Sequence, residues 1–437
     1  MTDPAISSIF STREIEAAAL AAYREGRQAA SQQKYGKAIR FYTDALSYEG
    51  TPTLFQARVH EYRGLCHWLL SDFDAAEEDY QAALTISNDA EQIARARVRL
   101  GELADFRGDF EEADNLYRQA LTEGLTVGNI LVVGRARRGL GILSRKKGDT
   151  ENAIRHLTQA LAAFRQMGEA REQARVMTSL GRARHARGEY QYALNAHNEA
   201  LTIFESLNDR WRVVQTLTDI GECHQALYDT ANALHYHEKA LKLAYEYGAN
   251  LLKPEIQRNL GVDMVEQGRY DEGLVYLHLA LDGARHLGNK EQEALALYNI
   301  ARAYLLHSQA EDADPIVAEL VQIAELLNAD RFRALASFVR GELLFHQGQQ
   351  AEAVAELNAA MLSAQTSVDR GVLWKLHATI SHVVDNPQIA AVHRTIAAEF
   401  IRQTAEPLQD QHLKSCFVFA PPVLAILNLA GINPAKL

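Results

Sequence analysis

Small and apolar residues recur along this chain with a period close to 40 residues. Within each period the apolar positions are three and four residues apart, the spacing that places side chains on one face of an α-helix. The pattern predicts successive pairs of helices, because two such stretches separated by turn residues fill each period. The spacing between anchors is 38, then 37 and then 40 residues throughout, and the small residues that anchor the first helix of each expected pair are Gly26, Gly64, Gly101, Gly141, Gly181, Gly221, Gly261, Ala301 and Gly341.

The second helix of each expected pair has its own repeating positions. Twelve residues after most anchors stands an alanine, as in Ala38 and Ala76, and sixteen and nineteen residues after them stand a large residue and another alanine, as in Tyr42 and Ala45. We expect the small residues to lie where two helix backbones approach closely and the large residues to fill the space between pairs. Enlarging a small residue should then disturb the packing.

Helix-ending residues also recur. The turn inside a pair carries Gly108, Gly148, Gly188, Gly268 or Gly348. A second set separates one pair from the next and consists of Gly168, Asn208, Gly248, Gly288 and Asn328. Glycine and asparagine tolerate the left-handed backbone conformation that commonly ends a helix. Each period is therefore predicted to run helix, cap, helix, cap.

Four segments carry these positions most clearly. They are GDFEEADNLYRQAL (108–121), GEYQYALNAHNEAL (188–201), YDTANALHYHEKAL (228–241) and GRYDEGLVYLHLAL (268–281), and each resembles the tetratricopeptide repeat (TPR). The resemblance implies an all-α, right-handed superhelical solenoid of antiparallel helix pairs. Because the period is 40 rather than 34 residues, the repeats are similar to the longer ones of kinesin light chains, LGN-type adaptors and bacterial signalling regulators.

The resemblance divides the chain into four segments. Residues 1–18 form an N-terminal leader, residues 19–361 about nine repeats, and residues 362–404 a degenerate tenth helix pair. Residues 405–437 are apolar enough to cover the last exposed face of the solenoid, so we expect a C-terminal capping segment, since terminal repeats need outer faces of their own.

Composition and motifs argue against several classes of function. The formal net charge of -11 disfavours nucleic acid and anionic membranes as general partners, because both attract basic surfaces. The three cysteines are far apart and form no metal-binding pair, which fits a reducing cytoplasm. We see no export signal, no membrane span and none of the phosphate-loop, hydrolase or metalloprotease motifs. We therefore expect no enzyme activity and no cofactor or metal, and the sequence specifies no oligomeric state.

Arginines repeat on the first helices of consecutive repeats. In TPR proteins the first helix lines a concave groove, so the resemblance places Arg58, Arg95, Arg135, Arg138, Arg175 and Arg182 on its wall. Guanidinium groups bind carboxylates and phosphates in a bidentate manner. Three alternatives stay open: the arginines pair with acids of the adjacent repeat, such as Glu102, Asp105 or Glu222; they bind an acidic peptide or protein; or they bind nucleic acid.

Further along, the groove is predicted to change character. Asn259 and Asn299 lie two residues before their anchors, where related repeats often use asparagine to hold a peptide backbone. Tyr298 and Phe338 belong to an apolar section that either forms a hydrophobic pocket for a partner or packs against the C-terminal tail. The sequence thus predicts a scaffold that binds a protein or peptide in the concave groove, and an acidic partner is one of the alternatives. The alternative is a regulatory sensor that binds a small peptide or ligand and signals to an effector.

Overall fold

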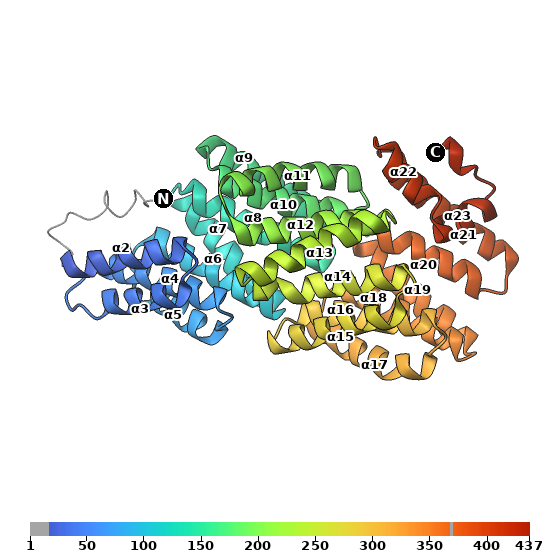
Figure 1. Ribbon diagram of the computed structural model, residues 1–437, viewed down its shortest axis with the longest axis horizontal. Coiled ribbons are helices and arrows are strands. Elements are labelled where there is room, and N and C mark those ends of the chain that lie inside the picture. Colours follow the sequence, from blue (N-terminus) through green and yellow to red (C-terminus); the bar gives the residue numbers. More distant parts are fainter. Residues whose placement is uncertain (1–16, 368–369) are drawn as a thin grey trace. The chain divides into compact units, whose positions relative to one another are not determined.

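The computed structural model describes residues 17–367 and 370–437, and every regular element in this part of the chain is a helix. The all-α prediction is therefore confirmed (Figure 1). Residues 1–16, most of the expected leader, lie outside the described residues. The chain divides into two compact units, residues 1–139 and 140–437, and each unit is described by itself.

Unit 1 consists of helices joined by short turns, with successive helices packed against each other. The division between the units falls within α8 (Ile130–Lys147). The helices before it are α2 (Ala17–Ser31), α3 (Tyr35–Leu46), α4 (Thr53–Leu69), α5 (Phe73–Ile86), α6 (Ala90–Arg107) and α7 (Phe110–Thr126).

Unit 2 continues the same arrangement of paired helices. Its long helices are α9 (Thr150–Met167), α10 (Ala170–Ala186), α11 (Tyr190–Ser206), α12 (Arg210–Ala226), α13 (Thr230–Tyr247), α14 (Lys253–Glu266), α15 (Tyr270–His286), α16 (Lys290–Leu306), α17 (Ala310–Leu327), α18 (Asp330–His346), α19 (Gln350–Ser367), α20 (Arg370–Val383) and α21 (Pro387–Ala405). Two short helices, α22 (Gln411–Val418) and α23 (Pro421–Leu429), follow, and the 3-10 turns η1 (Asn250–Leu252) and η2 (Pro434–Lys436) complete the unit.

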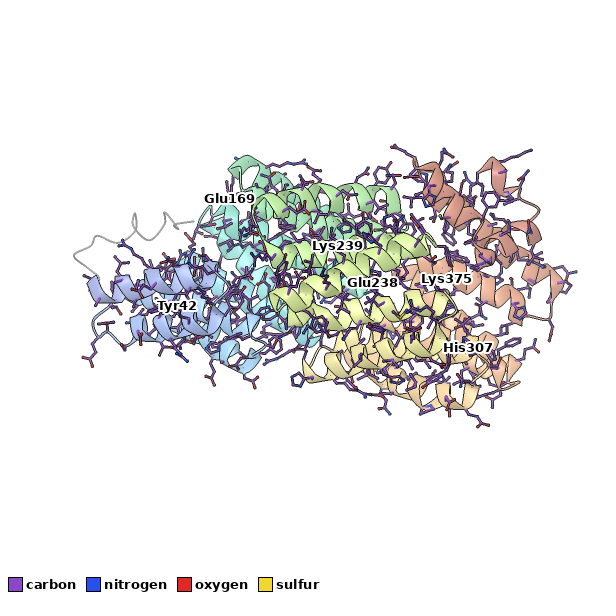
Figure 2. The ribbon with its side chains drawn as sticks, viewed as in Figure 1. Tyr42, Glu169, Glu238, Lys239, His307 and Lys375 are labelled. Atoms are coloured by element: carbon purple, nitrogen blue, oxygen red, sulfur yellow. The ribbon has the colours of Figure 1, made fainter. Side chains whose placement is uncertain are left out.

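The repeating small residues lie where the sequence places them, at the contact between the two helices of a pair. A Cβ atom added at any of the eight glycine anchors would come within 2.4 to 2.8 Å of the large side chain sixteen residues later. Tyr42, labelled in Figure 2, occupies this position against Gly26. Where the anchor is alanine, at Ala301, the residue sixteen positions later is the smaller Val317, and both are buried. Anchor and partner sizes therefore compensate each other.

Replacing Gly64 with alanine tests this packing. The new methyl group would lie 2.7 Å from Cε1 of the buried Tyr80 ring, so the two helices must separate. We expect the free energy of unfolding to fall by about 1–3 kcal/mol, the usual range for an overpacked core. The matched control is Gly36→Ala in the same unit, where no atom lies within 4 Å. Denaturant unfolding should show no loss for this control, and an equal loss in both variants would contradict the packing role of Gly64.

The predicted helix ends are confirmed. Gly148, for example, has a φ of 100°, and Asn208 and Asn328 also adopt positive φ between pairs. Four turns inside pairs depart from the pattern, because Gln33, Ser71, Tyr228 and Ser308 adopt positive φ where the other pairs have glycine. Tyr228, the bulkiest of the four, has a φ of 58°. A bulky residue rarely adopts this conformation. Tyr228 packs against an apolar cluster formed with the C-terminal segment, and this contact compensates for the unfavourable backbone conformation.

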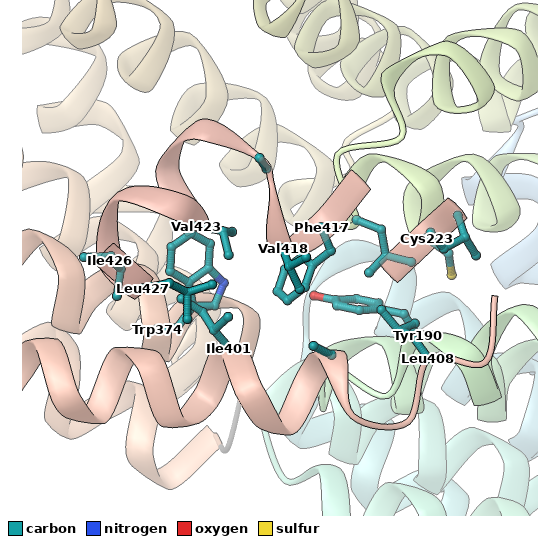
Figure 3. Packing of buried hydrophobic residues seen from close by; sticks show 14 of the residues in the cluster. Tyr190, Cys223, Trp374, Ile401, Leu408, Phe417, Val418, Val423, Ile426 and Leu427 are labelled. Atoms are coloured by element: carbon teal, nitrogen blue, oxygen red, sulfur yellow. The ribbon is translucent and has the colours of Figure 1, made fainter. Parts of the chain in front are cut away.

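The C-terminal segment folds back onto helices of unit 2 that precede it by about two hundred residues. Leu408 and Phe417 share one buried cluster with Tyr190 of α11 and Cys223 of α12 (Figure 3). Leu413 belongs to the same cluster. The backbone N–H of Gln409 donates to Oε1 of Gln191, at 3.1 Å.

Among the described residues, no single helix is long and apolar enough to cross a membrane. Only α22 and α23 together meet that length and composition, and they are bent by 69°.

Candidate functional site

The first helices of successive pairs contact one another. In unit 1, α4 contacts α6, and in unit 2 contacts run from α10 to α12, α14, α16 and α18 in turn. In a curved stack of repeats, helices on the inner side approach each other more closely than those on the outer side. The first helices therefore line the concave face of each unit, and the predicted site residues lie on them.

In unit 1 the predicted arginines are held by acids of neighbouring repeats. Nε of Arg95 lies 2.8 Å from Oε2 of Glu61, and both side chains are almost completely buried. Burial alone would raise the pKa of Glu61, but the charges of Arg95 and Arg99 outweigh it and hold this pKa well below its usual range. Three further predicted arginines lie in this unit. Arg58 lies 3.0 Å from Glu91, and Arg138 lies 2.7 Å from Glu102. Arg135 of α8 is partly buried.

In unit 2 the two predicted arginines lie on α10. Arg175 contacts Glu172 of its own helix at 3.2 Å. Arg182 reaches two other first helices, with Nε 2.5 Å from Oδ1 of Asp219 on α12 and Nη2 3.3 Å from Oε1 of Glu255 on α14. Arg182 therefore connects three successive helix pairs across the concave face.

A second ion-pair group spans a longer stretch of this face. Nζ of Lys146 on α8 lies 2.7 Å from Oε2 of Glu291 on α16, and Nη1 of Arg331 on α18 lies 3.3 Å from Oε1 of the same carboxylate. Burial would raise the pKa of Glu291, but the charges of Lys146, Arg145 and Arg331 outweigh it and lower this pKa to about 2. Residues 145 positions apart are thus joined across the concave face of unit 2.

The two predicted asparagines have different surroundings. Asn259 is buried, and its Nδ2 donates to Oε1 of Glu222 at 3.0 Å. Arg258 contacts the same Glu222 oxygen at 2.8 Å. The Nδ2 of Asn299 donates to the carbonyl of Leu295 in its own helix, at 2.9 Å. Asn259 therefore belongs to a charged network, whereas the partly exposed side chain of Asn299 forms a hydrogen bond within its own helix.

The predicted aromatic residues lie around one cation. Phe338 is buried and Tyr298 is half-buried, and both pack against a cluster that includes residues of α20. The guanidinium carbon of Arg302 lies 5.8 Å from the Tyr298 ring centroid and 5.6 Å from the Phe338 centroid, and its Nε lies 3.5 Å from Oε2 of Glu342. The cluster around these aromatics contains residues of α19 and α20 and none of the C-terminal tail (residues 405–437), so the tail does not cover them, and a pocket for a partner stays a prediction.

The concave surfaces thus carry positive and negative side chains that form ion pairs, rather than a column of unpaired cations. The alternative in which arginines pair with acids of other repeats is confirmed for Arg58, Arg95, Arg138 and Arg182. Binding of a partner by the ten predicted residues stays a prediction. Of these, Arg182 and Asn299 are accessible enough to contact a partner directly, whereas Phe338 is not.

Sequence reasoning did not single out several acids that complete these networks, namely Glu61, Glu91, Asp219, Glu255 and Glu291. A signal was present for part of the network. The residue directly after the anchor is charged in six repeats, and its sign changes between charged neighbours, as Arg182 precedes Glu222 and Arg302 precedes Glu342 by one period. Opposite charges at one position of adjacent repeats indicate ion pairs between them.

Comparisons with known proteins agree with this architecture. The tetratricopeptide repeat family model matches residues 55–122 and 132–206. No curated protein matches the chain. The matched residues are similar to tetratricopeptide repeats, and the same helix-pair packing continues beyond them in both units.

Three solved structures share its fold. A Rap protein complexed with the competence and sporulation factor has 16% identity and a TM-score of 0.63, covering 82% of this chain and 100% of that one. The Rap conjugation gene regulator of plasmid pLS20, in complex with the Phr* peptide, has 14% identity and a TM-score of 0.55, covering 80% and 99%. The apo form of the quorum sensor NprR from B. thuringiensis has 14% identity and a TM-score of 0.51, covering 82% and 99%.

Proposed function

We propose that this protein binds a partner peptide or an extended protein segment along the concave face of unit 2, and that it acts as a scaffold or adaptor rather than as an enzyme. The observation that carries the proposal is the set of charged side chains that line this face and remain partly accessible. Arg182 and Glu222 each keep 22% of their side-chain surface exposed, and Arg302 keeps 27%. Two of the similar solved structures are complexes, one with the competence and sporulation factor and one with the Phr* peptide.

The charges on this face define the chemistry of the partner. Arg182, Arg302 and Arg331 offer donors, and Glu222 and Glu255 offer acceptors. A purely acidic segment would meet carboxylates as well as guanidinium groups. We therefore infer a partner with polar groups of both signs, spaced along an extended backbone, in place of the acidic partner expected from the arginines alone. Free, buried cysteines at positions 66 and 223 support a cytoplasmic location.

One observation favours the second candidate, a regulatory sensor. The Lys146–Glu291–Arg331 ion pairs join α8 to α16 and α18. A ligand that competes for Glu291 would separate these helices and alter the curvature of unit 2, which is the conformational change that a sensor needs. A ligand that changes the distance between labels on α8 and α16 would support this candidate, whereas a scaffold would bind without such a change.

The binding proposal is tested by selecting peptides and then replacing two arginines of the concave face. Random displayed peptides are selected on the immobilised full chain, and the dissociation constant of the best synthetic peptide is measured by calorimetry. The double variant Arg302→Gln, Arg331→Gln should bind this peptide at least about tenfold more weakly, because a hydrogen bond to a charged group contributes about 1.5–3 kcal/mol.

The control is a second pair of arginines of unit 2. On α18, Arg340 is exposed and contacts Glu356, and Arg333 is partly exposed and contacts Asp330. The double variant Arg333→Gln, Arg340→Gln should bind the selected peptide as the wild type does, with the same helical content by circular dichroism. An equal loss of peptide affinity in both double variants, or selection of no peptide at all, would contradict binding at the concave face.

A further inference from the structure

Two segments of unit 2 that are far apart in the sequence bring three metal-binding side chains together. Asp229 lies in the turn between α12 and α13, and His412 and Cys416 lie one turn apart on α22. One ligand atom from each of the three residues lies within 4.8 Å of the others. The i and i+4 positions of His412 and Cys416 put both side chains on the same face of α22, toward Asp229.

The separations in this cluster suit a shared metal better than direct hydrogen bonds. Nε2 of His412 lies 3.5 Å from Oδ2 of Asp229 and 3.6 Å from Sγ of Cys416. The oxygen contact is longer than an ordinary hydrogen bond. Ligands of a tetrahedral zinc ion, each about 2.0–2.3 Å from the metal, lie about 3.3–3.7 Å from one another. The observed contacts therefore match two edges of a zinc coordination sphere.

The arrangement does not fit a catalytic triad. In a triad, the nucleophile and the carboxylate contact different nitrogens of the histidine ring. Here both Asp229 and Cys416 face the same atom, Nε2 of His412. A common position beside Nε2 is where a metal ion would contact all three side chains.

Asp229 differs from the other aspartates at the starts of second helices. Asp109 and Asp149 occupy the same place before α7 and α9, and each side chain accepts a hydrogen bond from its own helix backbone. The equivalent bond from the backbone N–H of Asn232 to Asp229 falls outside hydrogen-bond geometry, although this N–H still interacts with the carboxylate. Its Oδ2 instead faces Nδ1 of His224 at 2.9 Å and accepts from Nδ2 of Asn232 at 2.7 Å. These contacts orient the carboxylate toward α22.

The supporting contacts are those expected around a metal ligand. Ligating carboxylates are usually hydrogen-bonded by neighbouring groups, and these bonds orient the ligand. Leu413 and Phe417, on the same helix as the other two ligands, are buried in the cluster that holds α22 in place.

We propose that Asp229, His412 and Cys416 bind a zinc ion that attaches the C-terminal segment to the sixth repeat. Mixed sulfur, nitrogen and oxygen donors are ligands that zinc accepts, and water would complete four-coordination. The thiol of Cys416 gives up its proton to solvent when the metal binds. Because the three ligands come from segments about 180 residues apart, the ion would hold α22 against the turn between α12 and α13.

Cobalt(II) titration of the untagged, full-length protein, reduced and freed of metal, tests this site. We expect one equivalent to bind with tetrahedral d–d absorption and a sulfur-to-cobalt charge-transfer band, and zinc to displace it. Zinc should also raise the melting temperature of the wild type. Cys416→Ser should abolish the charge-transfer band, and His412→Ala and Asp229→Asn should each weaken zinc binding at least tenfold.

Two further variants distinguish a specific zinc site from adventitious zinc binding. His224→Ala leaves all three ligands in place but removes a partner of Asp229, and we expect zinc affinity to fall by about 10–100-fold. His286→Ala removes an exposed histidine of α15 and should leave zinc affinity unchanged. Absence of a cobalt–thiolate band in the wild type, or zinc affinity that survives both Cys416→Ser and His412→Ala, would overturn the proposal. Circular dichroism of each metal-free variant checks that the fold is intact.

Discussion

Replacing Glu61 with glutamine is expected to lower the free energy of unfolding of the surrounding repeats by about 3–5 kcal/mol, the cost of removing one partner of a buried ion pair. Glu61 accepts from Arg95 at 2.8 and 3.2 Å, and Arg99 lies 3.5 Å away. Without the carboxylate, the Arg95 guanidinium remains buried without a counter-charge. Urea unfolding followed by circular dichroism measures the loss.

A solvent-exposed ion pair of the same unit provides the control. Arg118 is 65% exposed and contacts Asp114 of its own helix. Asp114→Asn should change stability by less than about 1 kcal/mol, because water already solvates such pairs. If Glu61→Gln were as stable as the wild type, Arg95 would not depend on Glu61. Arg95 would then be available for partner binding. This experiment therefore also distinguishes ion pairing between repeats from partner binding as the role of this arginine.

Lowering the pH from 7 to 4 is expected to remove about 3 kcal/mol of stability through His377 alone. Its ring is buried between α20 and α21, with Nδ1 2.8 Å from Nδ1 of His393. Burial, together with the neighbouring His393, lowers the pKa of His377 from 6.5 to about 4. Because the folded pKa is the lower one, the unfolded chain takes up the proton first. The stabilisation is complete above pH 6.5 and is lost as the pH falls toward 4.

Urea unfolding at pH 7 and at pH 5 measures this effect. His377→Gln keeps a hydrogen-bonding group but cannot titrate, so its stability should fall by about 2 kcal/mol less than that of the wild type between these two values. His286→Gln, at an exposed position of α15, should retain the pH dependence of the wild type. An unchanged pH dependence in His377→Gln would show that His377 is not the group that titrates.

The repeat architecture could be predicted because it depends on local spacing. Each glycine anchor needs only the residue sixteen positions later, within the same helix pair, and the glycine and asparagine caps act within one turn. The histidines at positions 197 and 237 occupy the same place in two successive repeats, and both are buried beside their anchors. Such short-range relations are visible in the sequence as a period.

The candidate site was only partly predictable. Helical periodicity placed the arginines on the first helices, where the structure has them. Their partners depend on how successive pairs rotate against each other. Glu91 follows Arg58 by 33 residues, whereas Glu61 precedes Arg95 by 34, and no single offset identifies both acids. Charge alone therefore suggested an acidic partner, whereas the folded units supply much of the opposite charge themselves.

The sequence by itself determined the helix pairs, their caps and the small residues at their contacts, because each of these depends on atoms within about one repeat. Only the tertiary structure decided which charges meet. The Lys146–Glu291 pair spans 145 residues, and the Asp229, His412 and Cys416 cluster spans about 180. The reason is geometric: small rotations between repeats accumulate along a solenoid, so distant residues are brought together by the sum of many contacts and not by any one spacing.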